Sequence, residues 1–305
     1  MYTSLEKLGL LFLAYIAYKI GSKLLTFLFY YFAAPALSLA VDLKRMGKWA
    51  VVTGATDGIG KAYAEALAKK GLDIVLISRT KSKLEDVAAD IRSNYKVNTK
   101  IIEADFSLGD EVFATIEKEL YGLEIGVLVN NNKDRIYKTI IQCNINTVIN
   151  MCQIVMPAMV EQNKGVVINL SSASALFPCP MLSVYGASKA FVIKFSEDLA
   201  SEYEKKGIIV QCVAPGFVAS AMSKISKPTW MAPSPNKYVS CVLKTVGVQK
   251  LTMGYYPHFL MVGLLKFLQG ISHSLAAGLV TRTHENIRTR ALRKKEKGAI
   301  AALLD

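Results

Sequence analysis

Three residues of this chain, Ser172, Tyr185 and Lys189, have the types and the spacing to transfer protons at a carbonyl or alcohol carbon. Lys189 follows Tyr185 by four positions, so the two side chains share one face if the segment is helical. An ammonium beside a phenol stabilises the phenolate, which predicts a lowered pKa for Tyr185. Such a phenol can protonate a ketone oxygen or deprotonate an alcohol, and Ser172 would give that oxygen a second hydrogen bond.

A tyrosine and a lysine at this spacing also occur on many solvated helices, so a second pattern upstream is needed. The apolar run 49–52 leads into a glycine-rich turn, and strong helix formers follow it. Glycine there either joins a strand to a helix or lets the backbone approach a pyrophosphate at the positive helix end. Together with the downstream trio, the context predicts a dinucleotide site formed by Gly54, Thr56, Asp57, Gly58, Ile59 and Gly60.

The order of strand-like and helix-like stretches predicts an α/β fold with one doubly wound, Rossmann-like parallel sheet. A chain of 305 residues is long enough for one such domain with a full core. We expect a hydrophobic membrane anchor at 1–45, the dinucleotide-binding domain at 46–257, and an amphipathic, basic C-terminal region at 258–305. The expected strands are 50–53, 73–78, 100–104, 125–130, 165–170 and 208–213.

The cysteines, the histidines and the distribution of charge argue against disulfides, a metal site and a nucleic-acid partner. The five cysteines form no Cys-x-x-Cys pair and the three histidines have no metal-ligand spacing, so we expect reduced thiols and no metal.

The formal net charge is +13, and seven basic residues lie in the run from Arg282 to Lys297. This run fits either a solvated C-terminal helix or contact with anionic lipid headgroups. No aromatic residues interleave with it, so nucleic acid is not an expected partner.

The N-terminal 41 residues are mostly apolar, and 24–41 contain no charge. Three structures fit: a single tilted span with snorkelling lysines, a hairpin lying in one leaflet, and a cleaved signal peptide. Lys44, Arg45 and Lys48 follow at once, a pattern that keeps the downstream domain cytosolic. We therefore expect a membrane anchor with a cytosolic catalytic domain.

Two further segments bear on the membrane. The region 259–280 is apolar but interrupted by Lys266, His273 and glycines, which predicts an amphipathic, membrane-facing helix rather than a second span. The sequon at Asn169 falls on an expected core strand, so it does not argue for a lumenal domain.

With these motifs in order, the chain resembles the short-chain dehydrogenase/reductase superfamily from about Lys48 to about Tyr256. Segments 52–61, 76–79, 122–131, 157–161 and 244–247 resemble the subgroup of membrane-bound 17-beta-hydroxysteroid dehydrogenases type 3 and type 12, the latter also being very-long-chain 3-oxoacyl-CoA reductase. The resemblance implies an NADPH-dependent ketone reductase at the endoplasmic reticulum membrane. Its substrate would be a 3-oxoacyl-CoA or a 17-ketosteroid, and its partners would include a second copy of the chain in a homodimer.

The cofactor preference follows from Arg79, which ends the second expected strand where NAD enzymes have an acid. An arginine there pairs with a 2′-phosphate, so NADP(H) is expected, although a surface arginine at this place is common. The resemblance also places Lys189 and Tyr185 among the cofactor contacts, and it adds Asn144 to the catalytic residues as the asparagine that holds a water near that lysine. Further cofactor contacts that it implies are Asp105, Asn131, Pro215 and Gly216.

Substrate contacts are expected from apolar residues around the trio. Phe177 and Met181 lie between Ser172 and Tyr185, and Phe217 opens a segment that in the family walls the substrate. Apolar walls suit a fatty acyl chain or a steroid equally, and core packing explains the same residues nearly as well.

One departure from the family concerns Asn130-Asn131-Asn132-Lys133, where relatives have a glycine after the two asparagines. The connection to Asn144 is also much shorter, although it still permits a helix from about Tyr137. The expected consequence is a more open site or an impaired one. The alternative to a reductase is therefore a nucleotide-binding protein with impaired catalysis, and a lumenal dehydrogenase is a third reading.

Overall fold

The computed structural model describes residues 4–106, 111–131, 140–221, 223 and 225–301. Its centre is a seven-stranded sheet in which every pairing is parallel. The strands are β1 (Trp49–Thr53), β2 (Asp73–Ser78), β3 (Thr99–Glu103), β4 (Ile125–Asn130), β5 (Gly165–Leu170), β6 (Ile208–Val213) and β7 (Leu251–Thr252). Their order across the sheet is β3-β2-β1-β4-β5-β6-β7.

The predicted fold class is confirmed, and the six expected strands are found within one residue of their expected bounds. Strands β4 and β5 are buried along their whole length, which explains their continuous apolar sequence. The seventh strand was missed because β7 has two residues and pairs only with the end of β6.

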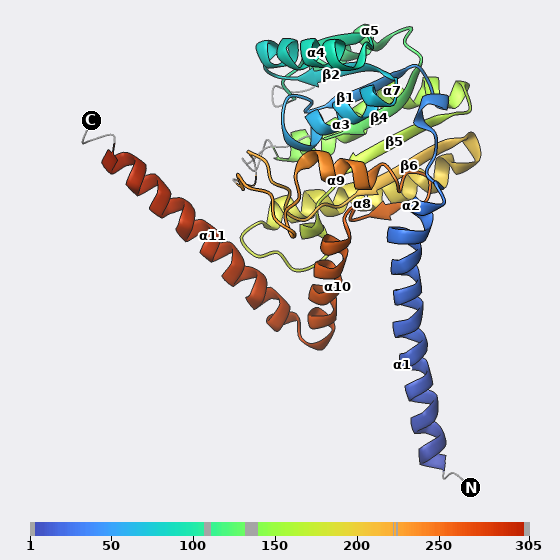
Figure 1. The fold of residues 1–305 in the computed structure, drawn as a ribbon, viewed down its shortest axis with the longest axis vertical. Helices are drawn as coiled ribbons and strands as arrows, with labels where there is room; N and C mark the ends of the chain where they lie inside the picture. Colours follow the sequence, from blue (N-terminus) through green and yellow to red (C-terminus); the bar gives the residue numbers. More distant parts are fainter. Residues whose placement is uncertain (1–3, 107–110, 132–139, 222, 224, 302–305) are drawn as a thin grey trace.

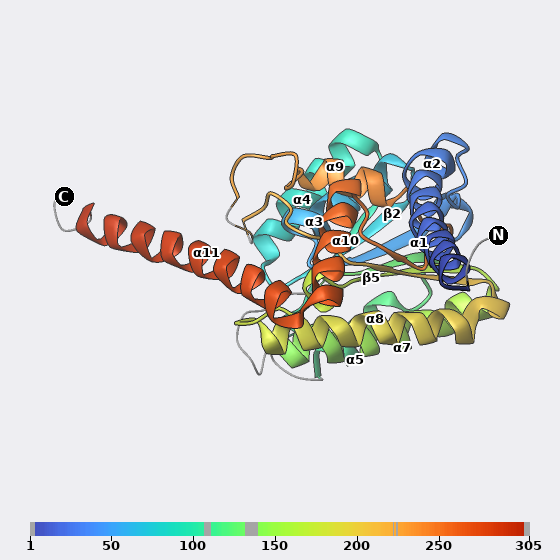
Figure 2. The ribbon, with the colours of Figure 1, turned by 90° about the horizontal axis from the view of Figure 1, so that it is seen from below.

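Helices cover both faces of the sheet (Figures 1 and 2). One face is packed by α3 (Gly58–Lys69), α4 (Lys81–Tyr95) and α9 (Pro235–Val242), and the other by α5 (Glu111–Leu120), α7 (Thr147–Glu161) and α8 (Ser183–Tyr203). The chain winds outward in both directions from β1 and β4, so the order reverses between these neighbours. In such sheets ligands bind at the carboxyl ends of the strands beside this switch point.

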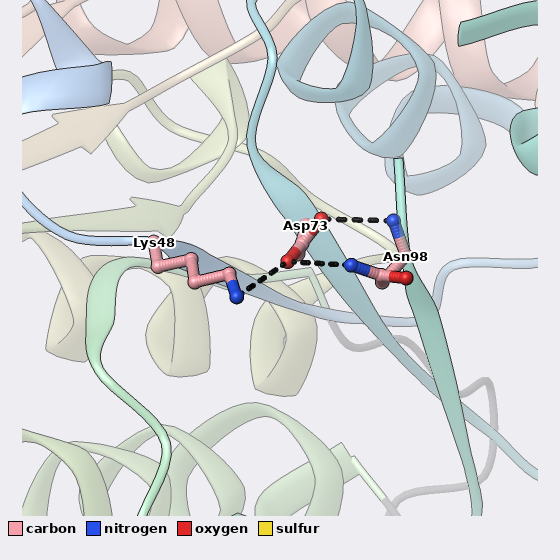
Figure 3. A network of polar contacts seen from close by, with 3 residues as sticks. All are labelled: Lys48, Asp73 and Asn98. Atoms are coloured by element: carbon pink, nitrogen blue, oxygen red, sulfur yellow. Dashed lines mark hydrogen bonds and ion pairs between the residues drawn. The ribbon is translucent and has the colours of Figure 1, made fainter. Parts of the chain in front are cut away.

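A polar network joins the opposite, amino-terminal edge of the sheet (Figure 3). Asp73 opens β2, and its carboxylate accepts hydrogen bonds from the backbone and side-chain amides of Asn98, at 2.8 and 3.2 Å. Lys48 lies 3.7 Å away on its other side. Lys48 directly precedes β1 and Asn98 directly precedes β3. The Asp73 carboxylate thus links the starts of these two strands to the start of β2.

The N-terminal segment forms one continuous helical rod rather than a hairpin: α1 (Ser4–Leu28), η1 (Phe29–Ala33) and α2 (Ala34–Ala36). It projects from the body, and its apolar side chains, such as Leu11 and Phe12, are exposed (Figure 1). Residues 6–36 are long and apolar enough to cross a membrane, by length and composition. Within the described chain, residues 142–161 pass the same test, but half of them are buried in the core.

The apolar region expected as one amphipathic helix is two helices, α10 (Tyr256–Ile271) and α11 (His273–Ala301). Ser272 separates them because its backbone is extended and its hydroxyl caps α11, accepting from the Leu275 amide. The ring of Phe259 packs against Phe27 and Tyr31 at 5.5 Å each, so α10 leaves the body beside the N-terminal rod.

Candidate active site

Three of the four proposed catalytic residues, Ser172, Tyr185 and Lys189, meet at the carboxyl end of β5. Ser172 follows that strand and caps the short helix η4 (Ala173–Ala175), whereas Tyr185 and Lys189 lie one turn apart near the start of α8. The Lys189 ammonium is 5.9 Å from the centre of the Tyr185 ring. Both side chains therefore project from the same face of the helix.

The Tyr185 phenol differs from expectation in its acidity. Burial raises its pKa above the ordinary value, and the hydrogen bond with Ser172 lowers it by less. The predicted net lowering of this pKa is wrong for this structure, because the desolvation of the phenolate outweighs the favourable contacts. A phenol with a raised pKa keeps its proton at neutral pH, which is the form that can protonate a ketone oxygen.

Lys189 is buried, and its ammonium donates a hydrogen bond to the Leu170 carbonyl oxygen at 2.9 Å. Its own carbonyl oxygen accepts from the Ser171 hydroxyl at 2.7 Å. The last residue of β5 and the serine after it thus hold the lysine, one at its ammonium and the other at its carbonyl oxygen. A buried charge so fixed can orient a polar ligand at the strand end.

Ser174 is a site residue that the sequence analysis missed. Its hydroxyl donates to Ser172 Oγ at 2.9 Å, and its backbone amide is 3.2 Å from the same oxygen. Because Ser172 Oγ accepts on this side, its own proton is free to point toward the phenol. A serine two positions from another is common in turns, so the sequence had no signal for this role.

The glycine-rich turn between β1 and α3 requires its glycines. Gly54 has φ +60°, and a Cβ there would lie 2.2 Å from the Asn131 carbonyl oxygen. A Cβ on Gly60 would lie 2.1 Å from the Gly54 carbonyl oxygen. Gly58 also has positive φ, and Asp57 caps α3 by accepting from its amide at 2.7 Å. The turn is thus a close-packed backbone cradle at a helix N-terminus, where an anion is favoured.

Asn131 supports this cradle from β4. Its amide donates to Thr53 Oγ1 at 2.9 Å and its side chain to the Gly54 carbonyl oxygen at 3.3 Å. Ile59, the remaining residue predicted for the turn, lies in the first turn of α3 and packs against the core.

Arg79 is exposed directly after β2, beside the glycine turn. The Thr56 and Ser78 hydroxyls are 3.1 Å apart, which joins the turn to the end of β2. Asp105 follows β3 and is half-buried; the Ala104 amide before it donates to the Ser78 carbonyl oxygen. The ends of β1, β2 and β3 therefore gather the residues expected on the adenosine side.

Asn144 lies in a π-helical turn, η3 (Gln142–Asn146), at the start of α7. It is buried, and its amide donates to Ser188 Oγ at 3.0 Å, next to Lys189. No partner is found for its side-chain oxygen among the described residues. A widened turn of this type is frequent at functional sites.

The expected substrate residues lie on the two segments next to the trio, one between Ser172 and Tyr185 and the other after β6. Pro215 holds the segment after β6 against η4 through a 2.8 Å hydrogen bond from the Ala173 amide. Phe217 and Met181 are nearly half exposed, and Phe177 is half-buried. Met181 has φ +69°, a strained conformation for a residue with a side chain. Apolar side chains thus stand at the surface beside the catalytic residues.

Comparison with known proteins identifies the family. The family described as short chain dehydrogenase matches residues 48–229. The very-long-chain 3-oxoacyl-CoA reductase of Homo sapiens is 41% identical over 297 residues, covering 90% of this chain and 94% of its own length. The reductase-A of that name from Danio rerio is 49% identical over 250 residues, covering 77% and 78%.

The chain belongs to the short-chain dehydrogenase family. It is an oxidoreductase that acts on ketone or hydroxyl groups. A short-chain dehydrogenase from Sphingobium yanoikuyae in complex with NADPH has a TM-score of 0.61 at 28% identity, covering 67% of this chain and 86% of its own. A 7beta-hydroxysteroid dehydrogenase matches the fold with a TM-score of 0.73 at 24% identity, covering 79% of this chain and 100% of its own.

Two further features of this short-chain dehydrogenase concern the segment after Asn131 and the residue His258. The shortened segment 132–138, including the expected helix start near Tyr137, lies outside the described residues. His258, in contrast, is fully buried beside Gly216 and was missed. The spacing of the three histidines excluded a metal site, and nothing in it indicated this contact.

Proposed function

We propose that the protein is an NADPH-dependent 3-oxoacyl-CoA reductase bound to the endoplasmic reticulum membrane. The observation that carries the proposal is the meeting of Ser172, Tyr185 and Lys189 at the end of β5, two strands from the glycine turn. Two strand spacings amount to about 10 Å, so one extended dinucleotide can reach both places. Relatives 41–49% identical are named very-long-chain 3-oxoacyl-CoA reductases.

In the proposed reaction Tyr185 donates its proton to the carbonyl oxygen of the substrate, and Ser172 holds that oxygen by a hydrogen bond. A bound reduced nicotinamide supplies the hydride to the carbonyl carbon, so the ketone becomes an alcohol. Lys189 orients the ribose and, after proton transfer, stabilises the phenolate. Proton transfer of this type contributes roughly 10²–10⁴-fold to the rate.

The residues present fit the cofactor. No Cβ fits on Gly54 or Gly60, and Gly58 has a positive φ, in the turn where a pyrophosphate would approach the N-terminus of α3. Arg79 stands exposed at the end of β2, where a guanidinium can pair with a 2′-phosphate. These contacts favour NADPH over NADH.

The reaction can be tested on the purified full chain by following NADPH oxidation. We expect turnover of long-chain 3-oxoacyl-CoA, slower turnover with NADH, and less with a 17-ketosteroid. Faster reduction of the ketosteroid would favour the steroid function instead. NADPH binding without reduction of either substrate would favour a nucleotide-binding protein with impaired catalysis.

The rod of α1, η1 and α2 is the proposed membrane anchor, and the tip of α10 and α11 is a second lipid contact. Leu264, Phe267, Ile271 and Leu275 are more than half exposed there. Figure 1 shows α10 leaving the body on the side from which α1 projects. Lys44 and Arg45 after the rod favour a catalytic domain in the cytosol.

These placements can be tested in microsomes and vesicles. We expect the chain to resist alkaline extraction and its catalytic domain to be digested by protease added outside. In vesicles with brominated lipids, Phe267→Trp should add fluorescence that the lipids quench, whereas Tyr121→Trp, on the exposed turn after α5, should not. An unquenched Phe267→Trp would contradict the second contact, and release into the alkaline supernatant would contradict the anchor.

A further inference from the structure

His258 lies in the first turn of α10, is completely buried, and faces the proposed nicotinamide turn. Its Nδ1 is 3.2 Å from the Gly216 amide, which donates to it. Its Nε2 is 3.0 Å from the Phe217 carbonyl oxygen and 3.1 Å from that of Met231. Only the neutral ring protonated on Nε2 satisfies all three contacts, since Nδ1 must accept and Nε2 must donate.

These partners are the two ends of one segment. Gly216 and Phe217 follow Pro215, which is bonded to the residue after Ser172. Met231 directly follows the segment 217–230, which is the proposed substrate wall. A single imidazole therefore bridges the start and the end of the proposed substrate wall, next to a backbone bond from the Ala219 amide to Pro233.

The ring is held tightly in this place. The rings of Tyr238 and Tyr255 lie 5.6 and 5.4 Å from it, centre to centre. A Cβ added to Gly216 would lie 2.9 Å from His258 Cδ2, so only glycine lets the turn approach the imidazole. Burial lowers the pKa of His258, which keeps the ring neutral.

We propose that His258 is a positioning residue. It holds the Pro215–Gly216 turn against the nicotinamide, and it links the two ends of the substrate wall to each other. The proposal rests on the proposed function, because it assumes that NADPH and a long acyl chain occupy these places. A histidine that only filled the core would affect stability alone. A positioning histidine must also change cofactor affinity and discrimination between long and short substrates.

The experiment compares His258→Gln with His258→Asn in the full chain held in phospholipid vesicles. The glutamine side chain places its amide nitrogen at about the reach of Nε2, so it can donate to the Phe217 and Met231 carbonyl oxygens but places no acceptor at Gly216. Asparagine is one methylene shorter and places its amide oxygen at about the reach of Nδ1, so it can accept from the Gly216 amide but does not reach the other two residues. We expect His258→Asn to keep NADPH Kd near the wild-type value. His258→Gln should raise Kd about tenfold, the factor for one lost hydrogen bond of ordinary strength.

The kinetic readout separates positioning from packing. His258→Asn should raise KM for a long-chain 3-oxoacyl-CoA more than for a short-chain one, whereas His258→Gln should keep the ratio of the two KM values. Tyr121→Asn, on the exposed turn after α5, is the control and should change nothing. Unchanged Kd and KM in both His258 variants with a lower melting temperature, or equal losses in both, would overturn the proposal.

A second measurement needs no variant, in case His258→Asn does not fold. Nitrogen NMR on histidine-labelled wild-type protein should show a neutral ring protonated on Nε2 whose resonances shift when NADPH is added. A ring protonated on Nδ1, or resonances unmoved by saturating NADPH, would overturn the assignment. A wild-type chain that binds NADPH without reducing 3-oxoacyl-CoA would contradict the proposed reaction, yet the Kd comparison would still test His258.

Discussion

The hydroxyl of Ser174 donates a hydrogen bond to Ser172 Oγ at 2.9 Å, so the serine beside the phenol is itself held by a serine two positions on. Removing the hydroxyl leaves Ser172 Oγ with only the longer, 3.2 Å contact to the Ser174 backbone amide, so it is held less firmly beside Tyr185. We expect Ser174→Ala to lower kcat roughly two- to tenfold, the range for one neutral hydrogen bond, without changing NADPH Kd. Ser201→Ala, on the exposed face of α8, should leave kcat unchanged.

Tyr185→Phe removes the proposed acid and retains the ring. We expect kcat to fall by roughly 10²–10⁴-fold while NADPH Kd stays within about twofold. Steady-state kinetics and fluorescence titration of the same sample provide both numbers. Unchanged turnover would remove the phenol from the mechanism.

Arg79→Asp reverses the charge where the 2′-phosphate is expected. We expect kcat/KM with NADPH to fall by roughly a hundredfold, because a charge-assisted hydrogen bond is replaced by repulsion, and NADH to become the better cofactor. Lys83→Asp makes a similar charge change at an exposed position of α4 and is the control. If both variants keep the NADPH preference of the wild type, Arg79 does not select the cofactor.

Asp73→Ala tests the network at the far edge of the sheet. It leaves the Asn98 amides without their acceptor, so the free energy of unfolding should fall by about 1–3 kcal/mol. Denaturant unfolding measures this loss, and kcat of the folded protein should not change because the network lies opposite the site. Asp198→Ala, in an exposed pair with Lys194, should leave unfolding nearly unchanged.

The lowered pKa of His258 predicts that the free energy of unfolding decreases as the pH falls below neutral. The pKa of this histidine in the folded chain lies below the ordinary 6.5, so the unfolded chain binds the proton first as the pH falls. Above 6.5 both states are neutral; below it the free energy of unfolding decreases, by up to about 1.4 kcal/mol per pH unit, until the folded pKa is reached. His258→Gln should show a flatter decrease between about pH 7 and about pH 5 in denaturant titrations. An identical decrease in the variant would contradict the shift.

Much of the fold was predictable because buried parallel strands such as β4 and β5 are continuous apolar runs between turns. The glycine turn was predictable for a similar reason, since Gly54 and Gly60 are required by backbone contacts that other residues cannot make. The break at Ser272 was not, because a capping serine inside an apolar region looks like any other polar interruption.

The site was less predictable where it depends on distant contacts. His258 lies 42 positions from Gly216, and only the packing of α10 brings them together. The direction of the pKa shift of Tyr185 also depends on burial, which the four-residue spacing to Lys189 does not report.

The side chain of Asn169 is closed off inside β5, where it donates to Ser196 Oγ at 3.0 Å and accepts from Asn130 at 2.9 Å. A sugar attached to this amide nitrogen would remove its hydrogen bond and could not fit in the core. The one glycosylation sequon of the folded chain is therefore inaccessible to a glycosyltransferase. A glycosylation assay of membrane topology needs an acceptor engineered elsewhere, such as the exposed turn at Tyr121.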